Sequence, residues 1–117
     1  MSADGTTIFS FNKQIVTNQS MVTNFNSPSW STKEVKTGAI QAVWSGGSSP
    51  VGLMQIAGSN DNINFTLIEG TILSTDGDTT GSNGWNMYEM GYPYLQFQYI
   101  ATSGSGLITV TISGKYI

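Results

Sequence analysis

Apolar and polar residues alternate with a period of two along several stretches of this chain. The alternation is clearest in residues 40–44 (Ile-Gln-Ala-Val-Trp), 95–99 (Leu-Gln-Phe-Gln-Tyr) and 108–112 (Ile-Thr-Val-Thr-Ile). One apolar face and one polar face are typical of half-buried strands in an antiparallel sheet. We find no window of 11 residues with the apolar spacing of an amphipathic helix. The pattern therefore predicts an all-β chain.

Short clusters of Gly, Asn and Ser separate these stretches and predict turns of the hairpin type. They are Gly46–Pro50, Ser59–Asn62 and Ser103–Gly106, and the longest predicted loop is Ser74–Gly84. Strands at such spacing predict a two-sheet antiparallel β-sandwich, with a small barrel as the alternative. The predicted strands cover 6–11, 14–24, 37–45, 51–58, 64–69, 71–73, 85–89, 93–101 and 107–116.

The pattern predicts a β-sandwich domain over residues 36–117. The alternation is weaker in residues 1–35, which form either edge strands or an N-terminal arm. A disordered tail does not hold as many apolar residues as this segment does. Because the strands from 37 onward suffice for a small sandwich, we expect part of the segment to contact another chain in a homo-oligomer. Deleting residues 1–25 should then leave a folded core. The apolar residues are Ile8, Phe9, Phe11, Ile15, Val16, Met21, Val22, Phe25 and Trp30.

The composition narrows the possible chemistry. The 117 residues include no His, Cys or Arg, and four Lys leave a net charge of −3. The commonest general base and the thiolate nucleophile are therefore absent. So few cations argue against nucleic acid and against a polybasic membrane anchor. Without a spanning apolar run or a signal peptide, we expect a protein made in the cytoplasm and without membrane contact. Because the usual catalytic residue types are missing, we also expect no enzymatic activity and no cofactor.

Two acidic segments are candidates for other roles. Asp76-Gly77-Asp78 could contribute to a calcium site, but an exposed turn explains the same residues. Asp61 follows Ser59 and Asn60 in a segment typical of an Asx turn, which is the role we predict for it. No spacing among the carboxylates singles out a glycosidase pair. We therefore predict no metal site and no catalytic residue.

The aromatic residues allow two interpretations. They can stack on sugars, or they can fill the core and a subunit interface. Trp85, Tyr88, Tyr92 and Tyr94 would form the sugar shelf of a carbohydrate-binding module. Tyr and Trp are also enriched at protein interfaces, which is the reading we favour. The candidate interface residues are Phe9, Phe11, Phe25, Trp30, Trp85, Tyr88, Tyr92 and Tyr94.

The order of these segments resembles that of β-sandwich proteins in tailed-phage virions. The resemblance covers about two-thirds of the chain and runs through Ile40–Trp44, Pro50–Gly52, Ser59–Asp61, Asn64–Thr66, Trp85–Asn86, Gly91–Leu95, Ser103–Gly106 and Gly114–Tyr116.

This resemblance implies a non-enzymatic particle component located in the virion. It would be a capsid decoration or cement protein, a head-fibre protein or a tail accessory protein that binds the major capsid protein or other virion proteins. The virion proteins that the chain resembles often carry Arg in the strand after a Tyr-Pro-Tyr turn, which is Tyr92–Tyr94 in this chain. Here Gln96 and Gln98 stand in that strand. The alternative is a carbohydrate-binding β-sandwich that recognises glycans of the host surface.

Overall fold

The computed structural model describes residues 10–87 and 90–116. Strands make up most of this part of the chain, and every pair of strands is antiparallel, which confirms the predicted all-β class. The strands are β1 (Ser10–Ser20), β2 (Phe25–Asn26), β3 (Trp30–Ser31), β4 (Val35–Ser59), β5 (Thr66–Leu67), β6 (Leu73–Ser74), β7 (Gly81–Asn86) and β8 (Tyr94–Tyr116).

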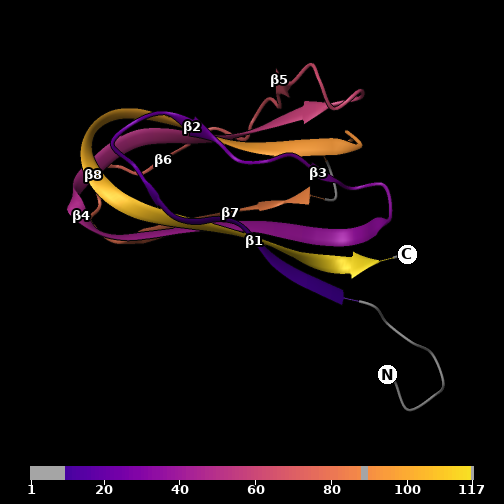
Figure 1. Cartoon of the computed structure of the whole chain (residues 1–117), viewed down its shortest axis with the longest axis horizontal. Coiled ribbons are helices and arrows are strands. Elements are labelled where there is room, and N and C mark those ends of the chain that lie inside the picture. Colours follow the sequence, from indigo (N-terminus) through magenta and orange to yellow (C-terminus); the bar gives the residue numbers. More distant parts are fainter. Residues whose placement is uncertain (1–9, 88–89, 117) are drawn as a thin grey trace, which may run out of the picture.

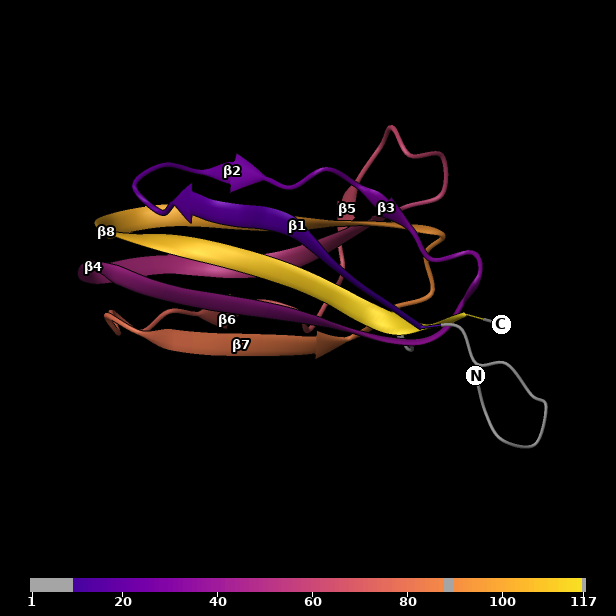
Figure 2. The same cartoon turned by 60° about the horizontal axis from the view of Figure 1, so that its bottom comes forward.

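One continuous hydrogen-bonded sheet folds back on itself to make the two layers of the sandwich. β4 and β8 pair along almost their whole lengths and curve together at one end of the molecule (Figure 1). The first layer holds β1, the second half of β8, the first half of β4, and β7. The second layer holds β2 and β3, the other halves of β8 and β4, and then β5 and β6 (Figure 2).

The predicted hairpin turns at Gly46–Pro50 and Ser103–Gly106 are wrong. Both segments lie inside long strands, opposite each other, where the β4–β8 register shifts repeatedly. Positive φ angles occur there at Gly46 (72°), Ser49 (42°) and Gly104 (79°). Gly and Ser clusters suit a β-bulge as well as a turn, and bulges bend a strand without ending it. We call these two facing segments the crease.

The core lies between the two layers and consists of the apolar faces predicted from the alternation. All nine inward residues of the three alternating stretches are buried, with at most 3% of their surface exposed. The register places these residues on the same inward face, since Ile40 pairs with Ile112, and Ile56 pairs with Phe97. The nine residues are Ile40, Ala42, Trp44, Leu95, Phe97, Tyr99, Ile108, Val110 and Ile112.

The described part of segment 1–35 runs along β8 on both layers. Val16, Met21 and Trp30 belong to the buried core, and Phe11, Ile15 and Phe25 pack against it. Their apolar surface is used within the chain, whereas Val22 is 59% exposed. The division of the chain at residue 35 stays a prediction, and Ile8 and Phe9 lie outside the described residues.

A serine side chain joins the N-terminal segment to β8 where the regular pairing is interrupted. The Ser27 backbone N–H donates to the Phe97 carbonyl (2.8 Å), and the Phe97 N–H donates to Ser27 Oγ (2.9 Å). Ser27 is buried, so both polar groups need such partners.

Candidate functional site

Two of the predicted interface residues are tryptophans that point into the core. Trp85 on β7 is 9% exposed, its Nε1–H donates to the Thr71 carbonyl (2.7 Å), and its ring meets Phe97 edge-on. Trp30 on β3 donates from Nε1 to Met87 Sδ (3.3 Å). Trp85 therefore does not contribute to an exposed shelf for sugars.

Two of the predicted interface phenylalanines, Phe11 and Phe25, are half-buried at the sides of the sandwich. Phe25 on β2 lies 6.0 Å from the Phe97 ring and 5.7 Å from the Tyr99 ring, measured between centroids. Phe11 on β1 pairs in register with Gly114 and packs against the core. Phe9 and Tyr88 lie outside the described residues, and the interface role of the whole set stays a prediction.

Tyr92 and Tyr94 lie at the end of the sandwich farthest from the crease, which we call the open end. β8 begins there at Tyr94, opposite Ser59, the last residue of β4. The Tyr92 ring packs over Gly58. The Tyr94 hydroxyl accepts a hydrogen bond from Lys33 Nζ (2.9 Å), and the same ammonium lies 4.8 Å from the ring centroid. Both rings are half-buried, so each keeps an exposed part.

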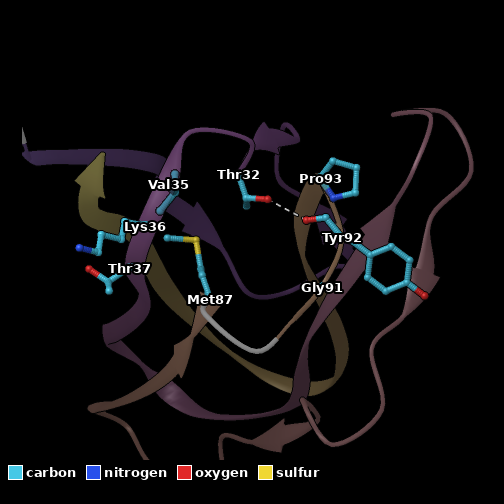
Figure 3. A pocket seen from close by; sticks show the side chains of 9 residues that line it. Thr32, Val35, Lys36, Thr37, Met87, Gly91, Tyr92 and Pro93 are labelled. Carbon is cyan, nitrogen blue, oxygen red and sulfur yellow. Dashed lines mark hydrogen bonds between the residues drawn. The ribbon is translucent and has the colours of Figure 1, made fainter. Parts of the chain in front are cut away.

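A pocket of about 330 Å³ opens between the two layers at the open end. The Thr32 hydroxyl donates to the Tyr92 carbonyl (2.7 Å) across its upper side, and the Tyr92 ring points away from it (Figure 3). Among the described residues that line it, Lys36 is the one with a charged side chain. We call it the end pocket; it is lined by Thr32, Val35, Lys36, Thr37, Gly38, Met87, Gly91, Tyr92 and Pro93.

Asp61 organises the loop after β4, residues 60–65, into the predicted Asx turn. Its carboxylate accepts hydrogen bonds from the Ile63 N–H (2.9 Å), the Asn64 N–H (2.8 Å) and the Asn64 Nδ2 (2.8 Å). The Ser59 hydroxyl adds a fourth (2.8 Å). These bonds favour the charged form and hold the pKa of Asp61 well below its usual range.

The Asp61 loop carries the most exposed large apolar side chain of the described residues. Ile63 is 78% exposed. The sequence predicts the turn here, but Ile63 is not among the predicted site residues. An isolated aliphatic residue at the tip of a predicted turn was the available signal, and it is a weak one because single exposed apolar residues are common.

The other acidic candidate, Asp76-Gly77-Asp78, is also part of a turn. Asp76 and Gly77 have positive φ angles (55° and 72°), and the Asp78 N–H donates to the Thr75 carbonyl (3.0 Å). The Asp78 carbonyl accepts from Trp44 Nε1 (2.8 Å), which fixes the turn to the core. Within residues 10–87 and 90–116, no three His, Cys, Asp or Glu side chains gather as a metal site would require.

The outward face of the first layer forms a shallow groove across four strands. In-register rows of small or uncharged polar residues line part of it, and the remaining lining includes Phe11, Ile40, Trp85 and Lys115. One row joins Asn12, Ser113, Ala39 and Asn86, and the next joins Thr111, Gln41 and Gly84.

Comparisons with known proteins identify the fold. No family model matches the chain, and no curated protein is similar in sequence. The crystal structure of the PBSX exported protein XepA has a TM-score of 0.64 at 12% identity and covers 89% of this chain. The SPBc2 prophage-derived protein YomS has a TM-score of 0.58 at 10% identity and covers 93% of this chain.

The two neighbours differ in how much of their own length is matched. The chain spans 36% of XepA but 96% of YomS. At these identities the likeness shows a shared fold, and both neighbours are phage-derived proteins. No helix in the described part of this chain is long and apolar enough to span a bilayer.

Proposed function

We propose that this chain is a non-enzymatic structural protein of a phage particle that acts through protein–protein contacts. The observation that carries the proposal is the fold shared with YomS, a prophage-derived protein, over 93% of this chain and 96% of that one. Within the virion we assign it to the surface as a capsid decoration or cement protein bound to the major capsid protein. A head-fibre or tail accessory protein would use the same kind of contacts.

The two outward faces of the sandwich are suited to docking on another virion protein through many individually weak contacts. On the second layer, Gln55 Nε2 donates to Gln98 Oε1 (2.7 Å), and Gln98 Nε2 donates to Gln96 Oε1 (3.0 Å). The groove on the outward face of the first layer is also lined mainly by uncharged residues. Uncharged polar surfaces lower the desolvation cost of docking, because no ion loses its water.

The edge of β1 that faces away from β8 offers a second kind of contact. Among the described strands, β1 pairs only with β8, so no described strand lies along this edge over Asn12–Ser20. An extended segment of a neighbouring protein can add to such an edge by β-augmentation. Bulges near Val16 shorten the regular part of the β1 edge, which limits non-specific pairing of this edge with other strands.

Binding to particles tests the proposal. Particles of the parent phage are prepared with and without the gene, and purified protein is added to the deficient particles before gradient sedimentation. We expect the chain in wild-type particles by mass spectrometry and saturable rebinding at a fixed copy number. An unrelated β-sandwich of similar charge is the control. A chain that is absent from wild-type particles and fails to rebind would contradict the proposal.

The groove on the first layer keeps glycan binding as a second candidate function. Its rows present amide and hydroxyl groups, including those of Asn12, Gln41 and Thr111, and such groups hydrogen-bond sugar hydroxyls. A glycan array followed by calorimetry tests it, with Gln41→Ala as the groove variant and Gln55→Ala on the opposite layer as the control. No binding at about 1 mM protein would remove this candidate.

A further inference from the structure

The Ile63 side chain is exposed, and hydrogen bonds hold the loop that carries it in one conformation. The Asp61 carboxylate binds the backbone N–H groups of Ile63 and Asn64, and Ser29 Oγ donates to Asn62 Oδ1 (2.6 Å), which joins the loop to the segment before β3. Exposed apolar side chains are usually unremarkable, but this one is 78% exposed on a loop that is already ordered. An ordered loop loses little conformational entropy when a partner binds it.

The end pocket lies at the same open end of the molecule. Val35 and Met87 form one side of it, and Pro93 with the Gly91–Tyr92 backbone forms the other (Figure 3). Its volume of about 330 Å³ is ample for a branched aliphatic side chain with its backbone. Ile63 does not fill the pocket of its own chain, because it remains 78% exposed.

The charges beside the two features are complementary. Asp61 precedes Ile63 by two residues and carries a carboxylate whose hydrogen bonds keep it ionised. Lys36 is the charged residue among the described residues of the pocket lining. A second molecule that places Ile63 in the pocket also brings its Asp61 toward Lys36.

We propose that Ile63 of one copy inserts into the end pocket of a second copy, with Asp61 facing Lys36, and that the contact is made reciprocally. Because one chain carries both halves of the contact at the same end, a two-fold arrangement satisfies both pockets at once. The inference concerns the purified chain alone. It can fail while the particle role holds, and the particle role can fail while self-association is observed.

Sedimentation equilibrium of the purified full chain tests the contact. We expect wild-type protein to self-associate and Ile63→Asp to weaken association at least about 100-fold, since burying one isoleucine corresponds to about 10- to 100-fold and the contact uses it twice. Ile72→Asp, at another exposed isoleucine (47%), should leave association unchanged. Lys36→Glu should weaken it by several-fold at low salt, whereas Lys13→Glu should not.

Disulfide trapping shows which surfaces meet, because the chain has no cysteine of its own. Separately purified Ile63→Cys and Thr37→Cys proteins, one of them tagged, are mixed under mild oxidation. We expect a mixed disulfide-linked dimer, and much less from Ile72→Cys with Thr37→Cys. A wild-type chain that stays monomeric to about 1 mM would overturn the proposal. So would association that Ile63→Asp leaves unchanged, or trapping that is equal for both pairs.

Discussion

Gly47 of β4 lies so close to Ser105 of β8 that a side chain at position 47 would collide with the Ser105 carbonyl oxygen. The two residues face each other at the crease, where the Ser48 N–H also donates to Ser105 Oγ (3.2 Å). The close approach lets two paired strands bend together, so the crease decides that one sheet becomes a sandwich. Glycine is needed at this position because it has no Cβ.

Gly47→Ala is therefore expected to lower the free energy of unfolding by about 2 kcal/mol or more, measured by urea denaturation, because the strands must separate to admit a methyl group. Gly84→Ala on β7 is the matched control, since its Cβ would lie 3.4 Å from the Ile40 carbonyl oxygen. That control should change stability by less than about 1 kcal/mol. Equal stability of both variants would contradict the close approach at the crease.

Met21 and Val22 are neighbours with opposite environments, and they test whether the N-terminal segment belongs to the fold. Met21 is fully buried and Val22 is 59% exposed. Met21→Ala should cost about 2–5 kcal/mol of unfolding free energy because it leaves a cavity, whereas Val22→Ala should stay within about 0.5 kcal/mol. Similar effects of the two variants would place Met21 outside the core.

Deleting residues 1–25 gives a stronger form of the same test. The sequence led us to expect a folded core after this deletion, but the structure predicts the loss of cooperative unfolding. The deletion removes β1 and the buried side chains of Val16 and Met21. Circular dichroism and urea denaturation of the truncated chain decide between the two outcomes. A stable, cooperative truncated protein would mean that β4 and β8 suffice with their remaining partners.

Tyr99 is expected to tolerate the loss of its hydroxyl. The group is buried without a hydrogen-bond partner, and the nearby Thr75 hydroxyl donates its proton to the Pro50 carbonyl instead (2.6 Å). Tyr99→Phe should therefore be neutral or should stabilise the protein by about 1 kcal/mol. A loss of more than about 1 kcal/mol would reveal a hydrogen bond to this hydroxyl.

The same tyrosine predicts a loss of stability in alkali. Burial raises the pKa of Tyr99 in the folded chain above the unfolded value of 10.0. Above pH 10.0 the unfolded chain releases the proton more readily, so stability falls as pH rises through this range. Thermal melts between pH 9 and 11 should show a smaller decline for Tyr99→Phe than for the wild type.

Asp61 predicts a loss of stability in acid. Its pKa is lower in the folded chain than the unfolded value of 3.8, so its contribution is complete above pH 3.8 and declines as pH falls below it. Asp61→Asn should lack this part of the acid decline and should speed hydrogen exchange at the Ile63 and Asn64 amides. Asn60→Ser is the control in the same loop. An acid decline identical in Asp61→Asn and wild type would contradict the role assigned to the carboxylate.

The sequence by itself determined the all-β class and the faces of the strands. In residues 40–44, 95–99 and 108–112, alternation identified every buried side chain correctly, because a strand places successive residues on opposite faces whatever its partners are. The Asx turn at Asp61 was equally local, since its hydrogen bonds join residues within three positions of the aspartate.

Only the tertiary structure decided where the sheet bends and which residues remain exposed. The Gly-Ser segments of the crease are compatible with a turn or a bulge, and pairing between Ser48 and Ser105 selects the bulge. Likewise, Trp85 and Ile63 are both large apolar residues near turns, but one fills the core and the other is exposed. Burial and bending depend on contacts between residues far apart in the chain, and a local sequence pattern does not specify those contacts.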